Sequence, residues 1–422
     1  MIRSMNSSSD SSMLGGRIRS MVIIIGLIGF LIWNLCLNDN LPYISSLTQT
    51  KNETTLKSNP VVHYNVENSK KSNKEEKTAV IHVGPHKTGT TAIQLALRKI
   101  PLEEDNYFAR TSFPKTRNDV RFATCFLPKT HLSSRRHSCD KSYYDLLKSQ
   151  WTTGQNVLTT AEAFDYPEID LESLRNYFKP WDNVNIIVYY RRYYDWLGSY
   201  YNQLVAKKVK YSDENMNSII FHLTDSNWVE SKTEQYTTHV IERYRRYFKN
   251  ITVLNFHESM GVIESFYCQG IQDATNACRT VQMMNTTDYK GRSSLPYKEI
   301  LIAARKANLV KIGSNSEFKL ALEFLEQKSH PELSVENETL ICLPPNVLDS
   351  MLTKSLEAEK ELFPDLFSSP LGEAALRADF EQHSKTNLCG ANVTTIINDR
   401  EWRNFFRDVG KSMRSKGSFF GI

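Results

Sequence analysis

The sequence predicts an α/β fold in which a central parallel sheet is flanked by helices on both faces. Two observations lead to this prediction. Short β-branched runs alternate with helical patterns along the chain, which is typical of βαβ units. The 422 residues include 11% aromatic and 23% charged residues, which is the composition of a large folded domain. The predicted strands are Thr78–Val83, Asn156–Thr160, Asn185–Tyr190 and Ile251–Phe256.

Helices are expected after these strands and on towards the C-terminus. The predicted ranges are Thr91–Lys99, Tyr194–Val205, Val262–Cys268, Tyr297–Asn308, Glu317–Gln327, Val347–Leu362 and Asp399–Ser412. The sequence contains no internal repeat. The formal net charge is +5, and neither a dense basic run nor a zinc-finger spacing is present, so nucleic acid is not an expected partner.

The segment Met21–Leu37 is almost uninterrupted apolar sequence and predicts a transmembrane signal anchor. As a helix it would span roughly 25 Å, which suits the thinner early secretory membranes. Arg17 and Arg19 should stay cytoplasmic, so that residues 1–20 form a cytoplasmic tail and the rest of the chain is luminal. A cleaved signal peptide is the alternative, although no A-x-A-like site follows the apolar run.

Residues 38–77 are rich in Asn, Ser, Lys, Thr and Glu and contain few large apolar groups. Such a segment cannot bury enough surface to fold, so we predict a disordered luminal stem. The folded luminal domain is expected at residues 78–422. The glycosylation sequons fit this topology and stand at Asn52, Asn250, Asn285, Asn337 and Asn392.

Six cysteines follow the apolar segment, an even number that favours disulfides in a luminal domain. Six cysteines allow fifteen pairings, so the connectivity is open. Proximity in sequence favours Cys125–Cys139 and Cys268–Cys278, which leaves Cys342–Cys389. The alternative is six reduced core thiols. We find no metal-binding spacing of His, Cys or carboxylate residues.

The segment His82–Thr91 reads H-V-G-P-H-K-T-G-T-T and follows a predicted strand directly. A turn between a strand and a helix presents backbone N–H groups to one point, which makes an anion site. Gly84 and Gly89 allow a close approach of the backbone, and the lysine adds positive charge. The candidate anion-binding residues are Lys87, Thr88, Gly89, Thr90 and Thr91.

The position of the lysine separates two classes of phosphate-binding loop. Nucleotide hydrolases carry G-x-x-x-x-G-K-[ST]. Gly84 and Gly89 have that spacing, but Thr90 stands where the lysine belongs. Lys87 lies inside the loop instead. The run from Lys87 to Thr91 resembles the 5'-phosphosulfate loop, close to K-[TSA]-G-T-[ST], of sulfotransferases that use 3'-phosphoadenosine-5'-phosphosulfate (PAPS).

A second motif follows the predicted strand Asn185–Tyr190. In the sulfotransferase family an arginine at this strand end and a serine eight residues later hold the 3'-phosphate of the donor. Arg191 and Ser199 match in identity and spacing, and a guanidinium offers a phosphate a two-point contact. The sequence departs from the family at Tyr193 and Trp196, where many members have proline and a second arginine. Arg192 is an alternative to Arg191 if the register slips by one.

This resemblance covers roughly Thr78–Arg279 and implies a three-layer, P-loop-like domain. It implies a sulfotransferase that moves a sulfonate group from PAPS to an acceptor hydroxyl and releases PAP without a metal. Membrane-anchored luminal members are mostly Golgi type II proteins that act on carbohydrate. A glycan is therefore the expected acceptor and the Golgi membrane the expected location.

The reaction needs a stabiliser of the leaving group and a base for the acceptor proton. Lys87 is the expected stabiliser. Glu162 is the first candidate base, because the loop after a parallel strand faces the cleft; a helix-terminal charge or a substrate-positioning group is its alternative role. His86 is the second candidate. His257 is a weaker third, for which a helix-cap role is the alternative.

Two other functions stay open. One is a luminal P-loop kinase or other phosphotransferase, which would need a lysine after Gly89 and a magnesium-binding aspartate after a later strand. The other is a non-catalytic scaffold that keeps a PAP-binding-like loop. Thr90 argues against the first function. The joint presence of Lys87, Arg191 and Ser199 argues against the second.

Overall fold

The structure is a computed structural model that describes residues 62–64, 76–100, 102–109, 120–128, 139–210, 219–284, 295–327, 331–334 and 338–417. One compact unit comprises Ser58–Ile422. The predicted cytoplasmic tail, the membrane anchor and most of the predicted stem lie outside the described residues. Among the helices that are described, none is long and apolar enough to cross a membrane.

Six strands form the main sheet in the order β1-β6-β5-β2-β4-β3. Five of them are parallel, and β1 pairs antiparallel with β6 at one edge. The bounds are β1 Val62–Tyr64, β2 Thr78–Val83, β3 Tyr107–Ala109, β4 Asn156–Ala161, β5 Asn183–Tyr190 and β6 Asn250–Asn255. The four predicted strands and the central parallel sheet are thus confirmed.

Two strands, β1 and β3, go beyond the sequence prediction. Each has three residues, which is too short for an alternating pattern to stand out. β1 falls within residues 38–77. The prediction of a disordered stem is therefore wrong for Val62–Tyr64, which adds an edge strand to the sheet.

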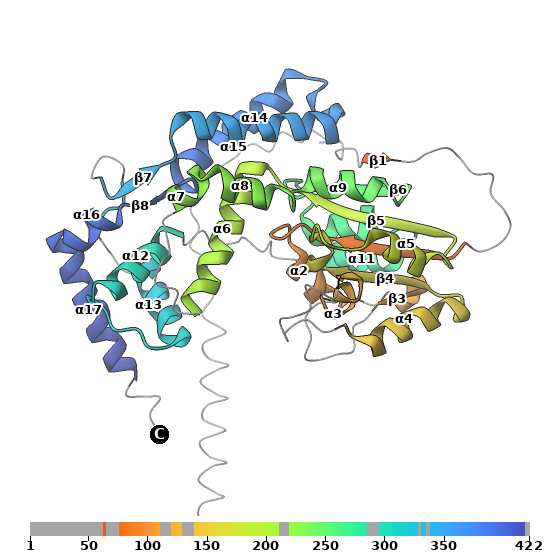
Figure 1. The fold of residues 1–422 in the computed structure, drawn as a ribbon, viewed down its shortest axis with the longest axis horizontal. Coiled ribbons are helices and arrows are strands. Elements are labelled where there is room, and N and C mark those ends of the chain that lie inside the picture. Colours follow the sequence, from red (N-terminus) through yellow and green to blue (C-terminus); the bar gives the residue numbers. More distant parts are fainter. Residues whose placement is uncertain are drawn as a thin grey trace, which may run out of the picture. The chain divides into compact units, whose positions relative to one another are not determined.

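Helices cover both faces of the sheet (Figure 1), because the buried side chains of each strand alternate between the faces. Val80 and Ile187 belong to a core with α2 (Thr90–Ala96) and α11 (Thr275–Met283). Ile81 belongs to the core on the opposite face. The helices of that second core include α4 (Lys141–Thr153), α5 (Leu171–Phe178), α6 (Tyr193–Lys210) and α9 (Thr237–Arg245).

The predicted helix Val262–Cys268 is only partly correct. Its first turn forms α10 (Val262–Ser265), and the chain then widens into a π-helical turn at Phe266–Gly270. Other short helices in the first part of the domain are α3 (Val120–Ala123), α7 (Ile219–Thr224) and α8 (Ser226–Thr233).

The C-terminal part is helical and has a core of its own. Trp402, Phe406 and Val409 are buried in it. The elements are α12 (Leu295–Lys306), α13 (Asn315–Gln327), β7 (Leu340–Cys342), α14 (Pro345–Leu362), α15 (Pro370–Thr386), β8 (Cys389–Ala391), α16 (Val393–Asn398) and α17 (Arg400–Gly417). The four helices predicted here are confirmed as α12, α13, α14 and α17, while α15 and α16 were not expected.

All three predicted disulfide pairings are present. They join Cys125 to Cys139, Cys268 to Cys278, and Cys342 to Cys389. The third joins paired positions of β7 and β8, so it ties the two strands of the smaller sheet together.

Two sequons fall on described residues. The Asn250 side chain donates a hydrogen bond to Asn183 inside the main sheet, and Thr252 of the same sequon is buried. The Asn392 side chain caps α16 by accepting from the backbone N–H of Thr395 at 3.3 Å. Glycosylation stays a prediction at both positions, and Asn52, Asn285 and Asn337 lie outside the described residues.

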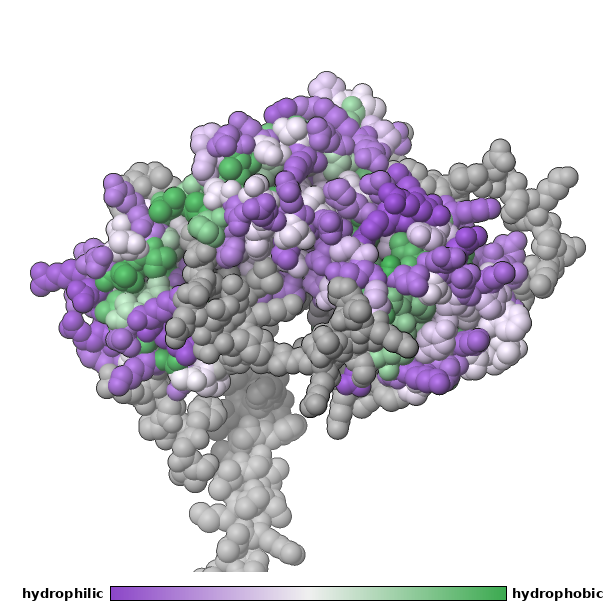
Figure 2. All heavy atoms as spheres, in the orientation of Figure 1, coloured by the Kyte–Doolittle hydropathy of each residue, from purple (hydrophilic) through white to green (hydrophobic). Residues whose placement is uncertain are grey.

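The face of the domain in Figure 2 is mostly hydrophilic, and its hydrophobic residues form small separate patches. Large exposed apolar side chains also come from separate elements, for example Phe221 of α7, Ile341 of β7 and Leu371 of α15. A scatter of this kind is ordinary for a folded domain.

Candidate active site

The candidate site lies where two neighbouring parallel strands, β2 and β5, send the chain to opposite faces of the sheet. After β2 the chain enters α2, which packs on one face, and after β5 it enters α6, which packs on the other. Ligands of open α/β sheets bind in the crevice at such a switch point, outside the carboxyl ends of the strands. The predicted loop and Arg191 therefore lie at this switch point.

The predicted anion loop forms a tight turn after β2. The backbone N–H of Thr88 donates to the Pro85 carbonyl at 3.2 Å, and the Thr88 hydroxyl donates to the same oxygen at 2.7 Å. Between them, Lys87 has a φ of 73°, a left-handed conformation that costs energy for any residue other than glycine. Such strain persists where the surroundings enforce it, often at functional sites.

The two glycines of the loop each prevent a collision. Gly89 has a φ of 85°, and a Cβ at this position would lie 2.7 Å from Val262 Cγ1. A Cβ on Gly84 would collide with the hydroxyl of Thr90. That hydroxyl is buried and has no hydrogen-bond partner among the described residues. A buried hydroxyl in need of a partner fits a loop that receives a ligand oxygen.

If this loop holds the expected donor PAPS, replacing Gly84 by alanine should weaken binding of PAP, the nucleotide product of PAPS. The new methyl group displaces the Thr90 hydroxyl and the start of α2, and we expect at least a tenfold weaker affinity, equivalent to about 1.4 kcal/mol. Calorimetric titration with PAP measures this change. Gly410→Ala is the matched control, since a Cβ there meets nothing within 4 Å. An unchanged affinity in Gly84→Ala would place PAP elsewhere.

Arg191 joins the loop to α6. Its Nη1 donates to the Lys87 carbonyl at 2.6 Å and to the Ser199 hydroxyl at 3.2 Å. Its Nε and Nη2 form a two-point ion pair with Asp195 at 2.6 and 2.8 Å. The guanidinium also lies 4.6 Å from the ring centre of Phe256. The structure thus brings together Lys87, Arg191 and Ser199.

Asp195 is held from several sides. His383 Nε2 lies 3.5 Å from Asp195 Oδ1, and His257 Nε2 lies 3.8 Å from Asp195 Oδ2. Burial alone would raise the pKa of Asp195, but Arg191 and His383 outweigh burial and hold this pKa well below its usual range. The carboxylate therefore stays ionised beside Arg191.

Arg192 does not take the place of Arg191. Its Nε contacts Glu359 and its Nη1 contacts Asp379, each at 2.8 Å, so it points towards α14 and α15. His257 is also engaged, because its Nε2 accepts the backbone N–H of Arg192 at 3.2 Å. Burial lowers the pKa of His257 to about 3. A base role for His257 is thus disfavoured, and a role in holding the strand end fits better.

The two remaining base candidates lie together. Glu162 begins the 3-10 helix η4 (Glu162–Asp165) directly after β4, and its Oε2 lies 3.8 Å from His86 Nε2. The other ring nitrogen, His86 Nδ1, lies 2.7 Å from Asp165 Oδ2. The Asp165 side chain is fully buried. The carboxylates of Glu162 and Asp165 therefore each lie near one ring nitrogen of His86.

Sequence reasoning missed two of the residues that build this site. Asp165 stands three residues after Glu162, and only the short helix η4 brings it under His86. Trp196 was noted as a departure from the family pattern. Its Nε1 donates to the His86 carbonyl at 2.8 Å, so it supports the loop at a position where many members of the sulfotransferase family carry an arginine. Of the predicted loop residues, Thr91 lies exposed on the first turn of α2.

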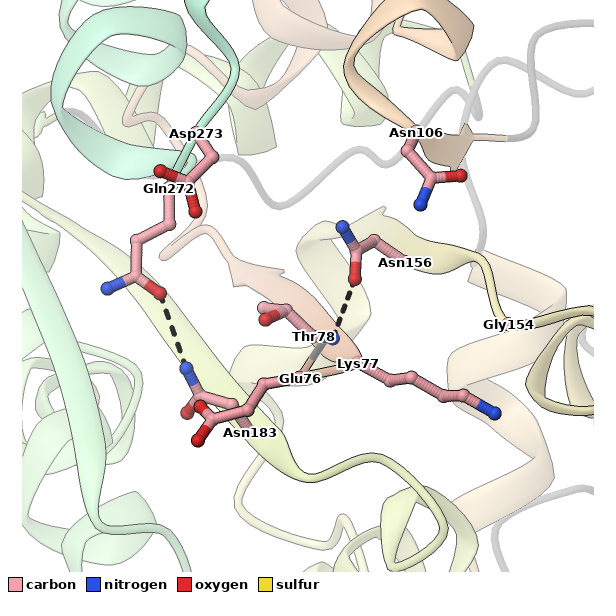
Figure 3. Close-up of a pocket in the computed structure, with 9 residues that line it drawn as sticks. All are labelled: Glu76, Lys77, Thr78, Asn106, Gly154, Asn156, Asn183, Gln272 and Asp273. Atoms are coloured by element: carbon pink, nitrogen blue, oxygen red, sulfur yellow. Dashed lines mark hydrogen bonds between the residues drawn. The ribbon is translucent and has the colours of Figure 1, made fainter. Parts of the chain in front are cut away.

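A polar pocket of about 420 Å³ lies at the opposite edge of the sheet (Figure 3). Thr78, Asn156 and Asn183, which begin β2, β4 and β5, contribute to its lining. Their contacts are structural: Asn156 accepts the Thr78 N–H at 2.7 Å, and Asn183 donates to Gln272 at 3.3 Å. Since the strands are parallel, this pocket is a sheet length away from the loop and contains none of the predicted site residues.

No family model matches the chain, and no curated protein matches it in sequence. Among solved structures, the chain is similar to a crystal structure described as a sulfotransferase from Alicyclobacillus acidocaldarius. The two share 16% sequence identity with a TM-score of 0.32, and the alignment covers 54% of this chain and 91% of the other.

Proposed function

We propose that the protein is a sulfotransferase that uses PAPS as the donor. The observation that carries this proposal is the contact of Arg191 with both the Lys87 carbonyl and the Ser199 hydroxyl. The loop proposed to hold the 5'-phosphosulfate and the residue pair proposed to hold the 3'-phosphate must contact the same nucleotide. They therefore have to lie close together. Arg191 and Lys87 are far apart in sequence, yet they meet at the crevice where the sheet connections diverge.

The proposed reaction is an in-line displacement at sulfur. The acceptor oxygen forms a bond to sulfur while the bond between sulfur and the bridging phosphate oxygen breaks. The electron pair leaves with PAP, and negative charge develops on the bridging oxygen. Lys87 and the backbone N–H groups of the loop stabilise that charge without reorganising.

The acceptor proton must leave as the new bond forms. Glu162 and His86 are the candidate bases, and they stand side by side at the end of β4 and in the loop after β2. The charge of Lys87, next to His86 in the chain, would attract the sulfonate to the same place.

The acceptor is proposed to be a carbohydrate, and the location the Golgi membrane, with a type II anchor and a luminal catalytic domain. Three disulfides support an oxidising compartment.

Calorimetry on the full chain tests the donor assignment. We expect PAP to bind in the absence of metal, and ATP with Mg²⁺ to bind more weakly. A preference for ATP with Mg²⁺ would favour a phosphotransferase. The absence of binding by either nucleotide would favour a scaffold. Labelled PAPS offered to polysaccharide, glycolipid and peptide acceptors then identifies the acceptor class.

A further inference from the structure

Asp165 is a buried carboxylate for which the proposed donor site has no use. It lies at the end of η4, and its side chain is fully buried. Its Oδ2 lies 2.7 Å from the His86 backbone nitrogen and 2.7 Å from His86 Nδ1. Both contacts go to one residue, so Asp165 determines where the backbone and the ring of His86 lie.

These contacts bear on the ring proton of His86. An ionised Asp165 would accept from both His86 donors through one oxygen, which would put a proton on Nδ1 and make Nε2 the accepting nitrogen. The contacts of Oδ2 fit an Nδ1–H imidazole that donates to an ionised Asp165, and Asp165 Oδ1 has no hydrogen-bond partner among the described residues.

The His86 ring is held on the remaining sides as well. Tyr166 stacks on it with ring centres 5.6 Å apart and an angle of 18°, and Tyr200 approaches it edge-on at 6.0 Å. Trp196 holds its carbonyl. Nε2 then faces Glu162 Oε2 at 3.8 Å, which is longer than a hydrogen bond.

We propose that His86 is the catalytic base that takes the acceptor proton at Nε2, and that Asp165 is the positioning residue that orients it. This inference rests on the proposed sulfonate transfer. The proton passes from the acceptor hydroxyl to Nε2 as the oxygen–sulfur bond forms, and Asp165 stabilises the resulting imidazolium. Glu162 then helps to hold the acceptor by accepting a hydrogen bond from it.

Charged and titratable groups approach this pair from several elements. They are Lys87 of the loop, Glu162 and Tyr166 around η4, Tyr200 of α6 and Arg243 of α9. Arg243 Nη2 donates to the Asp165 carbonyl at 2.7 Å. Burial raises the pKa of the Asp165 carboxyl above its usual value, and the charge and hydrogen bonds of His86 offset only part of that rise. Asp165 is the carboxylate in direct contact with the imidazole.

Asp165→Asn tests the positioning role. The amide oxygen of asparagine can occupy the Oδ2 position and accept from both His86 donors, so the geometry survives and the charge is lost. An imidazolium that lacks a neighbouring negative charge, here that of Asp165, loses its proton at lower pH. We expect the acidic limb of the pH–rate profile to move down by about 1 pH unit or more, with kcat falling at least tenfold and both Michaelis constants nearly unchanged. Asp145→Asn, on the exposed face of α4, should change none of these.

Glu162→Gln separates the two possible bases. If Glu162 only holds the acceptor, this variant raises the acceptor Michaelis constant and keeps the acidic limb where it was. Loss of the acidic limb in Glu162→Gln, with the limb unmoved in Asp165→Asn, would make Glu162 the base and overturn the proposal. A purely structural Asp165 would lower thermal stability without moving the limb.

NMR of the full chain with ¹⁵N-labelled histidine tests the assignment without any donor or acceptor. We expect His86 to carry its proton on Nδ1 at neutral pH, and its titration midpoint to fall in Asp165→Asn. A proton on Nε2 in the wild-type chain would overturn the proposal, even if Asp165→Asn does not fold. Absence of PAP binding would instead contradict the proposed function. The NMR measurement of the His86 proton would still be valid in that case, because it needs no nucleotide.

Discussion

Lys87→Ala should lower kcat for the proposed sulfonate transfer by about 10²–10³-fold, because the variant loses the positive group proposed to stabilise the bridging oxygen. The fold should persist, since the Lys87 carbonyl that receives Arg191 is retained. Initial rates with labelled PAPS measure the loss. Lys99→Ala, at an exposed lysine that follows α2, is the matched control. Near-normal activity in Lys87→Ala would contradict the proposed reaction.

Lys87→Gly refines this result. Alanine keeps the left-handed strain at a φ of 73°, whereas glycine relieves it, by about 1 kcal/mol. Both variants lack the amine and should be equally inactive, while the glycine variant should unfold at a higher temperature than the alanine variant. Thermal unfolding of the two variants thus separates the cost of the backbone conformation from the chemical role of the side chain.

Arg191→Ala should raise the Michaelis constant for PAPS by about 10–100-fold and change that of the acceptor much less. The guanidinium is the proposed partner of the 3'-phosphate, and a charge-assisted hydrogen bond contributes about 1.5–3 kcal/mol. Initial rates at varied PAPS and varied acceptor measure both constants. Arg175→Ala, at an exposed arginine of α5, is the control. An unchanged donor constant would remove Arg191 from the nucleotide site.

The alanine variant also leaves Asp195 without its two-point partner, and an unpaired buried charge destabilises a protein. The double variant Arg191→Ala with Asp195→Ala addresses this. It should recover part of the thermal stability and none of the donor affinity. If donor affinity returned together with stability, Arg191 would act on the nucleotide only by holding the fold together.

The sequence predicted the parts of the site that are continuous in the chain. Strong β-branched runs located β2 and β5, and the residues after them had to meet at one edge because parallel strands align their carboxyl ends. The resemblance to the sulfotransferase family named Lys87 and Arg191, and the parallel pairing of β2 with β5 accounts for their meeting. Two disulfides were predictable because their cysteines are near neighbours in sequence, and Cys342–Cys389 was the pair that remained.

Other contacts depend on backbone geometry that no pattern encodes. Asp165 reaches His86 only because β4 ends in a 3-10 turn rather than in an α-helix. Arg192 was an open alternative because adjacent residues look alike in sequence. In the structure Arg191 contacts the loop, whereas Arg192 contacts Glu359 of α14. The local sequence does not specify where α14 lies, so it could not distinguish the two arginines.

The antiparallel strand β1 has a practical consequence. Val62–Tyr64 covers the outer edge of β6, and the compact unit begins at Ser58. A fragment cut at the first predicted strand would expose the backbone of β6 to other chains, and open sheet edges promote association. A soluble fragment for crystallisation should therefore start upstream of Val62, so that it includes β1 and the edge of β6 stays paired.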